Sequence, residues 1–186
     1  MTVFHGSSIM ISDYLKPSLS NHGKELVYFS KYKNIAGFYI VKSDFYPYRF
    51  PNENNVLRYV EYFEDMFSYF YNGKNGFIYE VEETDDMYNP TQMDGLFVSE
   101  KQVHIKNRID INNVYEYFMK EQDNGRFELI KHKDIEDDEL NKIHQNLVKH
   151  IIRMGIEEDN NGVFANTIKV KLPSIWEKAI KEKELA

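Results

Sequence analysis

A histidine, a glycine and a serine follow one another near the start of the chain, at the end of a short apolar segment. They are His5, Gly6 and Ser7, and Phe4 precedes them. Imidazole and hydroxyl groups donate and accept hydrogen bonds, and a glycine lets a ligand approach the backbone N–H and C=O groups closely. A flat carboxamide needs such a paired donor and acceptor. Taken alone, the tripeptide is more simply explained as a strand that ends in a turn.

Two tyrosines with ten residues between them form the second feature. Tyr28 stands near the end of a short β-favouring run, and Tyr39 stands in the helical pattern that follows. Two aromatic rings placed in this way can face each other across a slot and hold a planar ring by stacking, which contributes about 0.5–1.5 kcal/mol per aromatic pair. In a chain with 14 tyrosines, two core positions would explain the spacing as well.

Taken together, the two features resemble the ADP-ribosyltransferase superfamily, in its diphtheria-toxin and poly(ADP-ribose) polymerase branch. The residues that carry the resemblance are His5, Gly6, Ser7, Tyr28, Phe29, Ser30, Ala36 and Tyr39. Small bacterial and phage proteins begin with a similar His-Gly-Ser strand. The resemblance implies an α+β fold, with split mixed or antiparallel sheets around an NAD cleft and helices at its flanks.

The resemblance also implies roles for individual residues. His5 would bond the nicotinamide-side ribose and the adenosine part of NAD, and the backbone of Gly6 would grip the nicotinamide amide with help from Ser7. Tyr28 and Tyr39 would enclose the nicotinamide ring. NAD is then a substrate, and no metal is required. The expected NAD-binding residues are His5, Gly6, Ser7, Tyr28, Ser30, Tyr39 and Leu96.

The third motif of the family is a catalytic glutamate at the start of a late strand, where it stabilises the oxocarbenium-like charge. Ungapped comparison with the small bacterial proteins puts this position on Leu96, and other alignments put it on Asp94. Glu100 shares strand parity with both, because side chains alternate between the faces of a strand. Gln92 is a fourth candidate. We therefore take Asp94 and Glu100, together with His5, as the candidate catalytic residues.

Each assignment has a different consequence for activity. If Leu96 holds the position, the chain resembles the mono-ADP-ribosylating polymerase relatives, which are thought to borrow a carboxylate from their substrate. It then equally fits an inactive binding or interaction module. If Asp94 or Glu100 reaches the ribose, ordinary transfer of ADP-ribose to a macromolecular acceptor, expected to be a protein, is predicted. An RNA 2′-phosphotransferase shares the fold but needs a set of arginines and histidines that we do not find.

Composition limits the partners and the compartment. The net charge of the 186 residues is −7, and acidic proteins bind nucleic acid poorly because phosphate affinity comes mainly from lysine and arginine. There are no cysteines, which excludes disulfides and thiol nucleophiles. The histidines lack a metal-binding spacing, and neither a membrane span nor a signal peptide is expected. These features predict a cytoplasmic protein, or one that acts in the host cytoplasm if a phage encodes it.

Hydrophobic periodicity predicts the elements that position these residues. Expected strands are Met1–Ser7, Leu26–Phe29, Phe77–Glu82, Leu96–Ser99, Gln102–Ile105 and Phe127–Lys131. Expected helices are Lys33–Val41, Val56–Tyr71, Ile111–Glu121, Asp134–Met154 and Ile175–Leu185. We predict an ADP-ribosyltransferase-like domain over residues 1–130, with residues 131–186 as a helical C-terminal extension packed on the same domain.

Overall fold

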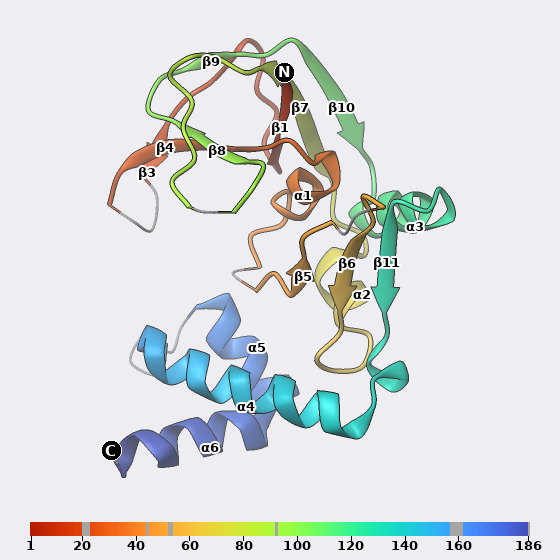
Figure 1. Cartoon of the computed structure of the whole chain (residues 1–186), viewed down its shortest axis with the longest axis vertical. Coiled ribbons are helices and arrows are strands. Elements are labelled where there is room, and N and C mark those ends of the chain that lie inside the picture. Colours follow the sequence, from red (N-terminus) through yellow and green to blue (C-terminus); the bar gives the residue numbers. More distant parts are fainter. Residues whose placement is uncertain (20–22, 44, 52–53, 92, 157–161, 186) are drawn as a thin grey trace. The chain divides into compact units, whose positions relative to one another are not determined.

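The computed structural model describes residues 1–19, 23–43, 45–51, 54–91, 93–156 and 162–185. Their contacts divide the chain into two units (Figure 1). The first unit consists of Met1–Lys42 and Tyr71–Phe127, and the second of Ser43–Phe70 and Glu128–Ala186. Residues 43–70 therefore group with the C-terminal helices, whereas the sequence predicts a single boundary after residue 130.

A six-stranded sheet forms the centre of the first unit, with strands in the order β10-β7-β1-β4-β3 and β8 paired with β4. All of the described pairings are antiparallel. The strands are β1 (Thr2–Ser7), β3 (Ser18–Leu19), β4 (Glu25–Ser30), β7 (Gly76–Glu82), β8 (Leu96–Ser99) and β10 (Asn107–Ile111). A separate two-stranded ribbon pairs β2 (Tyr14–Leu15) with β9 (Val103–His104).

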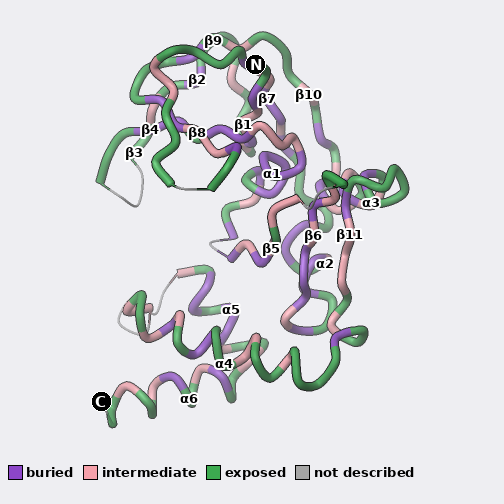
Figure 2. Tube along the Cα trace, viewed as in Figure 1, coloured by how far each residue is buried: buried purple, intermediate pink, exposed green. Residues whose placement is uncertain are grey.

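Two helices belong to this unit, α1 (Lys33–Phe38) and α3 (Val114–Asp123). Phe38 of α1 stacks on Phe118 of α3, with ring centroids 4.4 Å apart and planes 16° from parallel. Asn113 begins α3 as its N-cap, because its side chain accepts a hydrogen bond from the N–H of Tyr115. Figure 2 shows that α1 is buried along most of its length, which explains how so short a helix is stable.

The second unit combines a small sheet with three longer helices. Its sheet has the order β11-β6-β5, and its last helices are α4, α5 and α6. The bounds are β5 (Tyr48–Arg49), β6 (Leu57–Val60), α2 (Met66–Tyr71), β11 (Phe127–Ile130), a 3₁₀ turn η1 (His132–Asp134), α4 (Asp137–Met154), α5 (Val163–Lys171) and α6 (Pro173–Glu184). The boundary between the units falls inside α2 and β11. Within the described residues, no helix is long and apolar enough to cross a bilayer.

The structure confirms the α+β class and most of the predicted elements, but the helix expected over Val56–Tyr71 is wrong. Residues 57–60 form β6 and only Met66–Tyr71 is helical. Between them, Asp65 has a positive φ of 56°, a left-handed conformation that breaks regular structure and that aspartate adopts more readily than most other non-glycine residues. The aromatic and β-branched residues of this segment favour a strand as readily as a helix face.

At the C-terminus, residues 163–171 are helical although no helix was expected there. The following helix begins earlier than predicted, at Pro173, because proline suits the first turn of a helix. Helix α4 ends as expected at Gly155, whose φ of 63° is left-handed.

Candidate functional site

His5 is fixed by a hydrogen bond to the strand that carries Tyr28. Its Nδ1 lies 2.8 Å from the carbonyl oxygen of Tyr28. Because a carbonyl oxygen can only accept, Nδ1 carries the proton. Burial lowers the pKa of His5 below its ordinary value of 6.5, and the bond to Tyr28 opposes this shift. The neutral ring therefore presents Nε2 as a hydrogen-bond acceptor.

The two strands that carry this pair separate at the same place. Strand β1 pairs with β7 from Thr2 to Ser7, but among the described residues its register with β4 consists of Phe4 opposite Ser30. Beyond Phe4, the described register shows no further pairing of β1 with β4. The separation of the two strands begins at the His-Gly-Ser tripeptide.

Gly6 is required by packing on one side of β1. A Cβ atom at this position would lie 1.8 Å from the carbonyl oxygen of Ala36 and 3.3 Å from the backbone nitrogen of Ile40. The C-terminal end of α1 thus rests directly on the strand. On the Cβ side, the space that the missing side chain leaves is filled by the protein itself, and Gly6 is buried.

The serines of the motifs fix local turns. The Ser7 hydroxyl accepts a hydrogen bond from the N–H of Ile9 at 3.1 Å. The Ser30 hydroxyl, which is buried, accepts one from the N–H of Tyr32 at 3.0 Å. Each hydroxyl satisfies a backbone donor where a strand ends, which is a recognised role of serine in turns.

The tyrosines with ten residues between them are both accessible. Tyr28 is 43% exposed and Tyr39 is 42% exposed, although neighbouring Phe29 and Phe38 are buried. Tyr39 is the C-cap of α1, whose end rests on Gly6. The structure thus brings Tyr28, Tyr39 and Gly6 into one unit. The Phe29 ring packs 6.1 Å from the His5 ring on the opposite face of β4 from the Tyr28 side chain.

Three candidates for the catalytic position lie along or beyond β8. Leu96 pairs with Ser30, in the last row before β1 and β4 separate. Asp94 forms an ion pair with Lys31, and the carbonyl of Gly95 accepts a hydrogen bond from the Lys31 N–H at 2.8 Å. The apolar side chain therefore occupies the row beside the split, and Asp94 is neutralised just outside it.

Glu100 lies past the opposite end of β8. It accepts a hydrogen bond from the Tyr88 hydroxyl at 2.9 Å, and the Lys24 ammonium is 3.9 Å away. The strand ends at Ser99, so the alternation used to align Glu100 with Asp94 does not extend to either residue. Gln92 lies outside the described residues.

Two residues that the sequence analysis did not select help to hold this region. Lys31 joins the end of β4 to the turn before β8. The Tyr79 hydroxyl donates to the carbonyl of Ile9 at 2.9 Å and accepts from the N–H of Ile11 at 2.7 Å, which fixes the segment that follows the tripeptide. The position of Lys31 beside the tyrosine motif was a usable signal, whereas nothing in the sequence distinguishes Tyr79 from the other tyrosines.

A cavity of about 470 Å³ adjoins this segment and is lined by Met10, Ile11, Ser12, Asp13, Tyr14 and Lys16. Among the described residues, no group of three or more metal-binding side chains occurs. Comparison of the chain with protein-family models, curated proteins and solved structures found no match. The residues and their geometry are therefore the basis for any functional assignment.

Proposed function

We propose that the first unit binds NAD and transfers its ADP-ribose to a protein acceptor. The observation that carries the proposal is the state of His5, whose Nδ1 is bonded to the carbonyl of Tyr28 while the neutral Nε2 is left as an acceptor. This acceptor stands where β1 parts from β4. A ribose hydroxyl of NAD supplies the matching donor.

The other motif residues fit the nicotinamide end of the same ligand. We propose that the backbone of Gly6, on the part of β1 beyond its paired residue with β4, meets the carboxamide, and that the exposed rings of Tyr28 and Tyr39 offer stacking surfaces to the pyridine. An aromatic ring between two tyrosines is the arrangement that the resemblance to ADP-ribosyltransferases implies. We infer that the ligand lies along the edge of β1, because α1 fills the Cβ side of Gly6.

The reaction would proceed by cleavage of the bond between the ribose C1′ and the nicotinamide nitrogen. The bonding electron pair leaves with neutral nicotinamide, and the ribose carries the developing positive charge. A carboxylate stabilises this charge, and a nucleophilic atom of the acceptor bonds to C1′ and releases its proton to water. Because Leu96 occupies the row beside the split, we propose that the acceptor supplies this carboxylate; Glu100 and Asp94 are the internal alternatives.

Labelled NAD tests this proposal. Purified protein incubated with NAD labelled in the adenylate part should label itself or a lysate protein and release nicotinamide. His5→Asn keeps a donor for the Tyr28 carbonyl but lacks Nε2, so it should fold normally and lose most of the transfer. Absence of label and of nicotinamide release from the wild-type protein would reject the enzymatic assignment.

A second candidate is an NAD-binding module without catalysis. The pairing of Leu96 with Ser30 and the ion pair between Asp94 and Lys31 favour it, because an apolar side chain occupies the row beside the split and the nearby Asp94 is already paired. Calorimetry separates the candidates. A module would bind NAD with an affinity that His5→Asn lowers, and it would return the nucleotide unchanged after long incubation.

A further inference from the structure

A second cavity, of about 480 Å³, lies in the other unit of the chain, remote in sequence from the motifs above. Its lining residues are Phe63, Glu64, Asp65, Ser68, Tyr69 and Lys171. Its volume is within the range of about 300–1,000 Å³ that is usual for small-molecule sites. The first five residues come from the loop before α2 and from α2 itself, and Lys171 is the last residue of α5.

Two aromatic rings stand nearly at right angles in this cavity. The centroids of Phe63 and Tyr69 are 5.9 Å apart, and the ring planes make an angle of 77°. The Phe63 side chain is 5% exposed and therefore fixed, whereas Tyr69 is 50% exposed and open to a ligand. Aromatic faces carry negative electrostatic potential, so two such walls attract a cation that lies between them.

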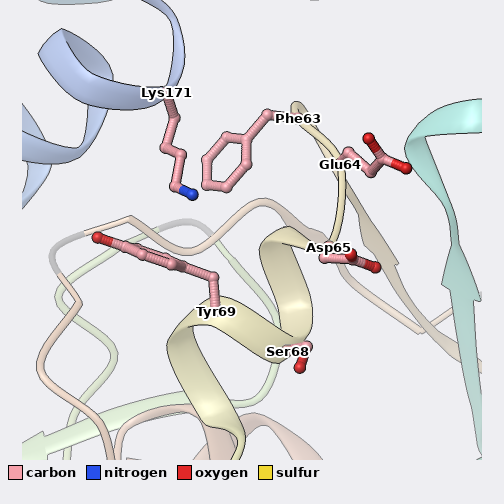
Figure 3. Close-up of a pocket in the computed structure, with 6 residues that line it drawn as sticks. All are labelled: Phe63, Glu64, Asp65, Ser68, Tyr69 and Lys171. Atoms are coloured by element: carbon pink, nitrogen blue, oxygen red, sulfur yellow. The ribbon is translucent and has the colours of Figure 1, made fainter.

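The chain's own ammonium already lies beside these rings. Lys171 Nζ is 4.6 Å from the Tyr69 centroid and 5.8 Å from the Phe63 centroid, both within the range of a cation–π contact. Figure 3 shows Lys171 reaching from α5 toward both rings, while the carboxylates of Glu64 and Asp65 point away from it. The cavity thus holds an ammonium by its aromatic walls.

The charges around the cavity also suit a cation. Its lining contains two acidic side chains, Glu64 and Asp65, and one basic side chain, Lys171. The net charge of these lining side chains is negative when Lys171 lies in the cavity, and it becomes more negative when Lys171 moves out. A primary ammonium is strongly hydrated and gains little from leaving water, whereas a methylated ammonium is larger and more weakly hydrated.

We propose that this aromatic cavity binds a methylated or quaternary ammonium group, and that Lys171 is an internal occupant that such a ligand displaces. The chemistry is shared by free choline-like compounds and by trimethyl-lysine side chains of proteins. The proposal does not depend on the function assigned to the first unit.

Calorimetric or NMR titration of the full chain with choline tests the proposal, with 3,3-dimethyl-1-butanol as the uncharged ligand of the same shape. Choline should bind at millimolar concentration and the alcohol should not. Lys171→Gln should tighten choline binding about two- to fivefold, which is the weight of one exposed cation–π contact. A parallel titration with the methylamide of N-acetyl-trimethyl-lysine identifies which source of the ammonium group is preferred.

Three further variants make the result specific. Tyr69→Leu should weaken choline binding about two- to fivefold, whereas Tyr69→Phe, which keeps the ring, should not. Lys169→Gln removes a charge from the same helix, but Lys169 lies over Trp176, 4.8 Å from that ring's centroid, so it should leave choline affinity as in the wild type. The proposal is overturned if folded Lys171→Gln protein does not bind choline at about 50 mM, if it binds the alcohol equally well, or if Tyr69→Leu binds as tightly as the wild type.

Discussion

Replacement of Gly6 by alanine tests the packing that sets the geometry of the proposed NAD site. The new Cβ would lie 1.8 Å from the carbonyl oxygen of Ala36, whereas ordinary contacts begin at 3.4 Å. The neighbouring atom is backbone, so no side chain can rotate away. Either β1 or the end of α1 has to move by about 1.6 Å. Overpacking of this kind costs about 3 kcal/mol, the upper part of the usual range for such substitutions.

Urea denaturation followed by far-ultraviolet circular dichroism measures this cost, and hydrogen exchange of the α1 amides locates it. Gly162→Ala is the matched control, because Gly162 has a φ of −66° and no atom within 4 Å of its Cβ position. We expect the control to remain within about 1 kcal/mol of the wild type. If Gly6→Ala also remained within about 1 kcal/mol, with α1 still protected from exchange, the seating of α1 on β1 would be refuted.

Three further outcomes are expected. Tyr39→Ala should weaken NAD binding by about 0.5–1.5 kcal/mol in calorimetry, because it removes one of the two rings proposed to stack on nicotinamide. Arg126→Ala should destabilise the fold by about 2 kcal/mol, because Arg126 makes two 2.7 Å hydrogen bonds to the buried Glu121; this loss should shrink as the pH falls below 4.5, since Arg126 lowers the pKa of Glu121. Because the pKa of His5 is lowered in the folded protein, the unfolded chain binds a proton at a higher pH than the folded chain does. The free energy of unfolding should therefore fall as the pH drops below 6.5, and denaturation curves should show a smaller dependence on pH for His5→Asn.

Strands β1, β4, β7, β8 and β9 of the first unit were predictable because their apolar residues alternate or run continuously, whereas β2, β3 and β10 were not predicted. The strand predicted over Phe77–Glu82 is β7, and the one predicted over Leu96–Ser99 is β8. The helix predicted over Val56–Tyr71 was wrong, because its aromatic residues fit both periods and the break occurs at a single aspartate, Asp65, which is a weak turn signal. The local sequence predicts whether a segment is a helix or a strand better than it predicts where that segment is interrupted.

The candidate site residues all lie in the first unit, and their contacts with one another depend on strand register. The hydrogen bond between His5 and the Tyr28 carbonyl joins residues 23 apart in the sequence. The close approach of Gly6 to Ala36 depends on where α1 packs against β1. Neither follows from residue types. Gly6 was expected to let a ligand approach the backbone, whereas the space on its Cβ side is occupied by the end of helix α1. The NAD-binding roles of these residues stay predictions.

The central claim is that the part of β1 beyond Phe4, the acceptor nitrogen of His5 and the two exposed tyrosines form one site for NAD. A crystal structure of the protein with NAD bound tests this most directly. We predict a ribose hydroxyl within hydrogen-bond distance of His5 Nε2 and the nicotinamide ring between Tyr28 and Tyr39. NAD found on another surface, or Nε2 of His5 enclosed by protein atoms with no ligand beside it, would contradict the account.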